Sequence, residues 1–193
     1  IHELPPGHWI RVTAGGDVEI RRWWDLPSTE DERLTERQVI PRALELMDEA
    51  VRRHLVSDVP VGVLLSGGLD SSAVAALMRR HTSEPVRTYT VGFEETTFDE
   101  RAPARKVAAH LGTVHKEVVV TPATVRGMLP GYLRWIDEPY ADGSAIPTWC
   151  VSALAREDVT VRLSGEGGDE AFAGYDTHAA LKVAAPARLV PGV

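Results

Sequence analysis

The chain has 193 residues, of which 44% are apolar, and it carries a formal net charge of −7 at pH 7. This length and composition allow one sizeable hydrophobic core, whereas the acidic balance argues against a surface for nucleic acid or for an anionic membrane. Cys150 is the only cysteine, so no disulfide can form within the chain and a reducing compartment is expected. No signal peptide is recognisable, and the longest apolar run (59–65) is too short to cross a bilayer. We therefore expect a cytoplasmic protein without nucleic-acid or membrane partners.

Residues 1–27 contain two short extended runs, "HWIRV" and "DVEIRRWWDL", separated by the turn-forming stretch "TAGGD". They predict a β-hairpin, which is too small to form a domain by itself. The chain begins at Ile1 rather than at a methionine and ends in "PARLVPGV" without a terminating signal. We therefore interpret it as an excerpt of a longer protein.

Residues 28–56 predict a polar linker followed by a helix, because apolar residues recur there at helical spacing. Thr35 and Gln38 have the spacing of a capping box, but a helix that began there would place Pro41 beyond the first turn and lose a hydrogen bond. We therefore predict that this helix starts near Pro41.

Residues 57–193 alternate between short β-branched runs and longer helical ones, which is typical of βαβ units around a parallel sheet. The runs are apolar enough to be buried on both faces, so the prediction is an open parallel sheet with helices on both faces. The predicted strands are 61–66, 87–92, 115–120 and 159–164, and the predicted helices are 70–81, 100–111, 122–136 and 144–156.

The stretch "LLSGGLDSSAV", residues 64–74, lies where the first of these strands ends and a helix begins. Backbone amides at such a position bind anions. Two glycines allow close approach of a ligand and three serines add hydroxyl donors: Gly67, Gly68, Ser66, Ser71 and Ser72. The alternative is a turn in which Asp70 and Ser71 only cap the helix. A cap needs one small polar residue rather than this whole pattern, so we favour a phosphate site.

The loop lacks the lysine of a Walker motif, and the chain has no GxGxxG fingerprint. Charge neutralisation of a phosphate must then come from elsewhere. Asp70, inside the loop, indicates a metal ion rather than a side-chain cation.

A second glycine-rich loop, "VRLSGEGGDEAFAGY" (161–175), follows the last predicted strand and faces the same crevice. Asp169 in this loop is well placed to share a metal with Asp70. Two carboxylates about 4 Å apart would repel by roughly 4 kcal/mol at an effective dielectric near 20, and Mg²⁺ bridging both to phosphate oxygens removes that conflict. The alternative is an acidic glycine turn on the surface.

These stretches resemble a known family. "SGGLDSS" is similar to the pyrophosphate loop of the ATP pyrophosphatases, and together with "YTVGF", "AAHLGTVHKEV", "DEP", "AIPTW" and "LSGEGGDEAFAGY" the chain resembles the synthetase domain of the glutamine-hydrolysing asparagine synthetases. The resemblance implies an adenine nucleotide alpha hydrolase-like fold over 57–193. It implies that ATP adenylates the aspartate side chain, with release of pyrophosphate, and that ammonia then forms asparagine and AMP.

The resemblance also implies partners and site residues. Residues 1–27 would be the closing strands of an amino-terminal glutaminase domain that supplies ammonia from glutamine, and a homodimer would be compatible with it. Glu166 would assist formation or capture of the aspartyl-adenylate, and Asp70 and Asp169 would bind Mg²⁺. The ATP contacts would be Leu65, Ser66, Gly67, Gly68, Asp70, Ser71, Ser72, Val91, Gly92, Ser164 and Gly165.

The chain also departs from the family pattern. It has no cysteine at its amino terminus, and the loop "PYADGSAIP" after Asp137 lacks an arginine that some members carry for carboxylate recognition. Related enzymes that close β-lactams or cyclise peptides through the same adenylation therefore remain alternatives. So does a nucleotide-binding module without turnover, and we expect the excerpt alone to be poorly active or inactive.

Overall fold

The computed structural model describes residues 2–27, 34–137 and 142–184. The chain divides into two compact units, residues 1–42 and 43–193. Among the described residues, no helix combines the length and hydropathy that a bilayer-spanning segment needs.

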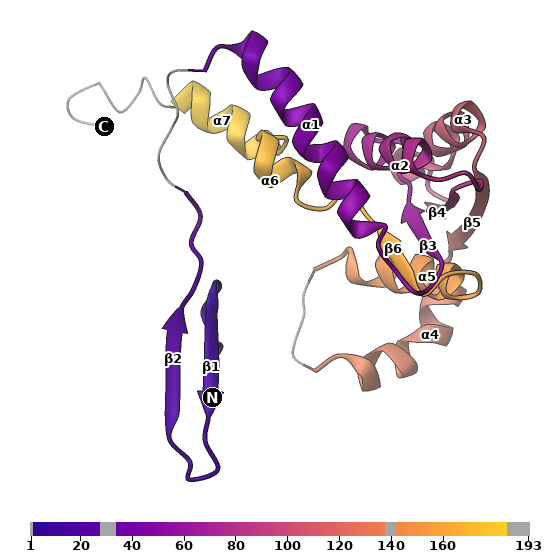
Figure 1. Ribbon diagram of the computed structural model, residues 1–193. Coiled ribbons are helices and arrows are strands. Elements are labelled where there is room, and N and C mark those ends of the chain that lie inside the picture. Colours follow the sequence, from indigo (N-terminus) through magenta and orange to yellow (C-terminus); the bar gives the residue numbers. More distant parts are fainter. Residues whose placement is uncertain (1, 28–33, 138–141, 185–193) are drawn as a thin grey trace. The chain divides into compact units, whose positions relative to one another are not determined.

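The first unit contains an antiparallel hairpin, as the sequence predicts (Figure 1). Strand β1 (His8–Val12) pairs with β2 (Val18–Arg22), and Ile10 lies opposite Ile20. The side chains of Ile10 and Ile20 are each about half exposed, at 49% and 51%. A two-stranded ribbon of this kind is marginally stable by itself.

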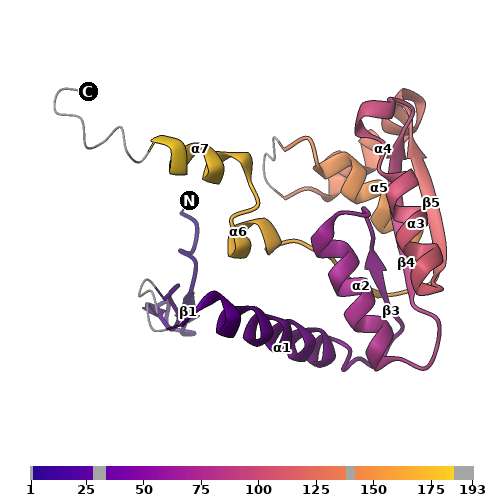
Figure 2. The same ribbon diagram turned by 90° about the horizontal axis from the view of Figure 1, so that it is seen from above.

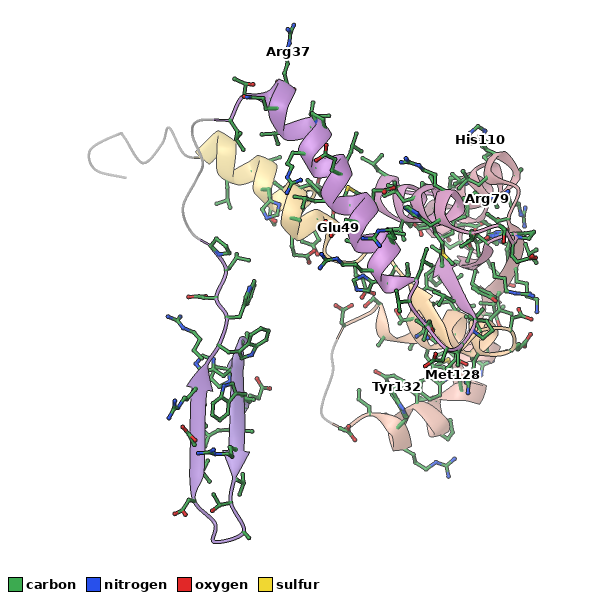
Figure 3. All side chains as sticks on the ribbon, viewed as in Figure 1. Arg37, Glu49, Arg79, His110, Met128 and Tyr132 are labelled. Carbon is green, nitrogen blue, oxygen red and sulfur yellow. The ribbon has the colours of Figure 1, made fainter. Side chains whose placement is uncertain are left out.

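Helix α1 (Glu36–His54) begins earlier than the sequence analysis predicts. The Thr35 amide donates to Gln38 Oε1 at 3.0 Å, which is the glutamine half of a capping box, and the helix starts in front of Pro41 rather than near it. The Thr35 hydroxyl donates to the same oxygen, and the Gln38 amide bonds to the Thr35 carbonyl. Pro41 leaves only the carbonyl of Arg37 without its helical donor. Both residues are exposed, and Figure 3 shows the Arg37 side chain projecting away from the helix, so water can hydrate that carbonyl.

The second unit is built on a four-stranded parallel sheet in the order β5-β4-β3-β6. The parallel sheet confirms the predicted fold class, and the strand ends differ from the predicted ones by at most two residues. The strands are β3 (Val61–Leu64), β4 (Arg87–Phe93), β5 (Val114–Val120) and β6 (Val161–Leu163).

The predicted helices are also present, and two short helices follow the last strand: one lies within the second glycine-rich loop and the other follows it. Helix α2 runs beside β3 (Figure 2). The helical segments after α1 are α2 (Leu69–His81), the 3₁₀ turn η1 (Thr96–Phe98), α3 (Arg101–Leu111), α4 (Pro122–Trp135), α5 (Ala145–Arg156), α6 (Gly168–Phe172) and α7 (Asp176–Ala184).

Hydrophobic clusters lie on both faces of the sheet. Val63 packs in one cluster with residues of α2 and α3, among them Ala75 and Ala104. Tyr89 packs in the other with Val151 of α5. Because successive strand residues face opposite sides, helices cover both faces, as predicted.

Candidate functional site

The two glycine-rich loops follow adjacent strands. β3 and β6 are parallel neighbours, with Val63 paired to Leu163, so their carboxyl ends lie side by side at one edge of the sheet. The first loop leads into α2 and the second into α6. This is the edge at which open parallel sheets bind ligands.

The amino terminus of α2 has free backbone donors. Gly68 is the N-cap and offers no side-chain acceptor, so Asp70 and Ser71 do not cap the helix. In the described part of the chain, the amides of Leu69 and Asp70 donate to no protein acceptor. They lie at the positive end of a 13-residue helix, an arrangement that favours an anion.

The serine hydroxyls of this loop have different roles. Ser66 Oγ and Ser71 Oγ are 2.9 Å apart, and the Gly68 amide donates to Ser66 Oγ at 3.1 Å, so these two serines hold the loop together. Ser72 Oγ is buried and finds no partner among the described residues. A buried unpaired hydroxyl is uncommon and is consistent with a missing polar ligand.

Gly67 has both a positive φ of 83° and a close neighbour. A Cβ added there would lie 2.5 Å from the Ala104 amide nitrogen and 2.6 Å from the Pro103 carbonyl carbon, both in α3. The tip of the loop therefore rests directly on the backbone of α3. No side chain fits at this position.

The second loop rests on Asp70. A Cβ added to Gly168 would lie 2.5 Å from Asp70 Cγ, and one added to Gly165 would lie 2.7 Å from the Ser71 amide nitrogen. Only glycine at these two positions allows the backbone to approach so closely. The fold therefore brings the Asp70 carboxylate against the loop that carries Glu166 and Asp169.

The acidic residues of the second loop have distinct surroundings. One Asp169 carboxylate oxygen lies against Gly174, and Glu166 is exposed, with its amide 3.4 Å from Ser164 Oγ. The Tyr175 hydroxyl donates to Glu170 at 2.5 Å. This hydrogen bond lowers the pKa of Glu170 and raises the pKa of Tyr175 to about 12. Sequence reasoning missed this pair, although both residues lie in the quoted motif.

The residues expected to contact adenosine lie at the ends of β3 and β4. Leu65 is 1% exposed, and its carbonyl accepts a hydrogen bond from the buried Thr90 hydroxyl. Val91 is half-buried in the cluster that includes Tyr89, and Gly92 is buried beneath the Arg101 side chain. Arg101 was not among the sequence candidates.

The donor set for a metal is small. Among the described residues, no group of three or more His, Cys, Asp or Glu side chains is arranged to hold a cation. Two carboxylates completed by phosphate oxygens are nevertheless a ligand set that suits Mg²⁺. The "PYADGSAIP" loop cannot be placed in the site, because residues 138–141 lie outside the described part of the chain.

The family model and the curated relatives indicate the same family. Residues 42–191 match the family model for asparagine synthase. The chain is 34% identical over 183 residues to a glutamine-hydrolyzing asparagine synthetase of Bacillus subtilis, covering 92% of this chain and 28% of that protein. It is also 34% identical over 191 residues to one of Oryza sativa, covering 89% and 30%.

The chain thus spans less than a third of the length of these relatives. Among solved structures, an NH3-dependent NAD synthetase of Campylobacter jejuni aligns with a TM-score of 0.48 and 18% identity, over 70% of this chain and 60% of that one. A likeness of this size gives no basis for transferring a function.

Proposed function

Because the chain belongs to the asparagine synthase family, we propose that the loops after β3 and β6 bind Mg²⁺-ATP and activate the side-chain carboxylate of aspartate as an adenylate. Ammonia would then attack the acyl-adenylate to give asparagine and AMP. The aspartyl carboxylate attacks the α-phosphorus, and pyrophosphate leaves. The ammonia nitrogen then displaces AMP and loses a proton.

One observation carries this proposal: Gly168 lies against the Asp70 carboxylate beside the unbonded amides of α2. The amides of Leu69 and Asp70 would bind phosphate oxygens. The carboxylates of Asp70 and Asp169 would hold the metal ion. Mg²⁺ in such a site neutralises phosphate charge that the loop, without a lysine, does not offset.

The remaining residues of the site would orient the reactants. The backbone at Leu65, Val91 and Gly92 would contact the adenosine moiety. Ser164 and Gly165 would lie along the nucleotide, and Glu166, exposed beside them, would face the acyl group. Because adenylation depends on positioning and charge stabilisation, rigid strand ends are a suitable frame for it.

The source of ammonia and the assembly belong to the same proposal. In the relatives' names the nitrogen donor is glutamine. We propose that residues 1–27 close a glutaminase domain of the parent protein, so that glutamine or free ammonia supplies the nitrogen. A cytoplasmic location and a homodimer are compatible with this role.

The test of the metal site is pyrophosphate release by the full-length parent protein, with ATP, Mg²⁺, aspartate and ammonium. Asp70→Asn should lower the rate at least tenfold, because one removed charge contact in a closed site costs on the order of 1.4 kcal/mol or more. Asp58→Asn is the matched control, since Asp58 precedes β3 at the opposite end of that strand. Equal rates for the two variants would contradict the metal assignment.

The role of Glu166 has a separate test. Glu166→Gln should leave the ATP dissociation constant unchanged, measured by calorimetry, and should slow pyrophosphate release, because the residue would act on the acyl group rather than on the phosphates. An unchanged rate would show that Glu166 takes no part in the chemistry.

The acyl substrate is identified by measuring pyrophosphate release without aspartate and with other carboxylic acids in its place.

A further inference from the structure

An ion pair at the start of α3 lies beside the candidate site, against Gly92. Arg101 Nε is 2.7 Å from Asp99 Oδ1, and Arg101 Nη2 is 2.9 Å from Asp99 Oδ2. The two side chains are only 24% and 18% exposed. The pair is bidentate, so it holds the guanidinium in one orientation.

This guanidinium ties α3 to the end of β4. The Arg101 side chain lies directly on Gly92, where any Cβ would collide with it, and Nη2 donates to the Phe93 carbonyl at 3.3 Å. Asp99 also accepts a hydrogen bond from the Arg101 amide at 3.3 Å. The first residue of α3 is therefore fixed against the last two residues of the strand.

The next residues of the same helix form the wall of the phosphate loop. Pro103 and Ala104 are the backbone on which Gly67 rests. Arg101 is only two or three residues from Pro103 and Ala104 in the same helix, so the backbone of α3 alone links the ion pair to the support of Gly67. A shift of α3 relative to β4 must therefore move the support of Gly67.

We propose that Arg101, held by Asp99, is a positioning residue for nucleotide binding: it fixes α3 on the end of β4 and so fixes the Gly67 turn of the phosphate loop. This inference rests on the proposed function for its consequence in catalysis. In this role Arg101 acts through the helix rather than as a phosphate ligand: its Nε and Nη2 donate to Asp99 and to the Phe93 carbonyl. The hydrogen bond from Arg101 also lowers the pKa of Asp99.

The first test needs no nucleotide. In the full-length protein, Arg101→Ala should increase hydrogen exchange at the Ser66 and Gly68 amides by about tenfold, because these amides bond to serine hydroxyls within the turn, which loses its fixed support. Arg105→Ala is the matched control: Arg105 lies one turn further along α3 and makes a comparable bidentate pair with Glu117, but its own side chain is 59% exposed. Exchange that rises equally in both variants, or in neither, overturns the positioning role.

The second test measures function. Arg101→Ala and Asp99→Asn should each raise the KM for ATP about tenfold, with a smaller change in kcat, because a displaced loop weakens binding before chemistry. The double variant should be no worse than the single ones, and Arg101→Lys should restore part of the affinity. A lower unfolding temperature with an unchanged KM would overturn the inference. A wild-type protein that releases no pyrophosphate would instead refute the proposed function, and the exchange experiment would still decide the positioning role.

Discussion

At the scale of single residues, the site depends on where side chains are absent. Asp70 has room for its carboxylate only because Gly168 has no Cβ, and the loop tip reaches α3 only because Gly67 has none. The hydroxyls of Ser66 and Ser71 hydrogen-bond to each other within the loop, which leaves the backbone amides as the main donors for an anion.

The contact between Gly168 and Asp70 leads to a prediction. Gly168→Ala would place a methyl group 2.5 Å from Asp70 Cγ, so the carboxylate must move away from the second loop. We expect the Mg²⁺-dependent affinity for ATP to fall about tenfold or more, measured by calorimetry with and without the metal.

The control is Gly127→Ala in α4, where an added Cβ meets nothing within 4 Å. It should leave ATP affinity unchanged and raise the free energy of unfolding by up to about 1 kcal/mol, because alanine is the better helix former. Full retention of metal-dependent binding in Gly168→Ala would show that the position of Asp70 does not matter.

At the scale of elements, α1 starts at its capping residues rather than at its proline. The sequence carries both signals, the capping-box spacing of Thr35 and Gln38 and the proline at position 41. In the structure Gln38 Oε1 accepts from the Thr35 amide, the Gln38 amide lies 2.8 Å from the Thr35 carbonyl, and the proline is accommodated inside the helix. The cost of an exposed proline is limited because water replaces the lost donor.

Because Pro41 has no amide donor for the Arg37 carbonyl, α1 should be less stable than the same helix with a residue other than proline at position 41. Pro41→Ala restores a donor to the Arg37 carbonyl and should stabilise α1 by about 1–3 kcal/mol, seen as slower hydrogen exchange of its first two turns. Pro122→Ala is the control, because Pro122 occupies the first turn of α4, where no amide donor is needed. Unchanged exchange in Pro41→Ala would mean that the first turns of α1 are held by other contacts.

At the scale of the whole second unit, one polar network joins β4, β5 and the end of α5. The Tyr89 hydroxyl donates to Asp158 Oδ2 at 3.1 Å, and Lys116 Nζ lies 2.7 Å from the same carboxylate oxygen. Burial, reinforced by Asp158, raises the pKa of Tyr89 to about 12. Lys116 in turn lowers the pKa of Asp158.

This network predicts an alkaline limit to stability. Because the folded pKa of Tyr89 lies above its unfolded value of about 10, its contribution is complete below pH 10 and is lost as the pH rises towards 12. Lys116, whose pKa is also raised, adds to the same loss. Urea unfolding between pH 9 and 12 should show a steep fall in the free energy of unfolding.

Tyr89→Phe should reduce the decrease in the free energy of unfolding between pH 9 and 12. Tyr132→Phe is the comparison, since Tyr132 is buried but donates to no carboxylate in the described part of the chain. A pH profile that is the same for wild type and Tyr89→Phe would exclude Tyr89 as its source.

The sequence by itself determined the parallel sheet, its helices and the two glycine-rich loops, because these depend on local patterns of apolar and turn residues. It could not show the contact of Gly168 with Asp70, the support of Gly67 by α3 or the Arg101–Asp99 pair. Those depend on the strand order β5-β4-β3-β6, which brings distant segments to one edge. Only tertiary packing decides which residues meet there, since periodicity shows the face on which a residue lies but not its neighbour.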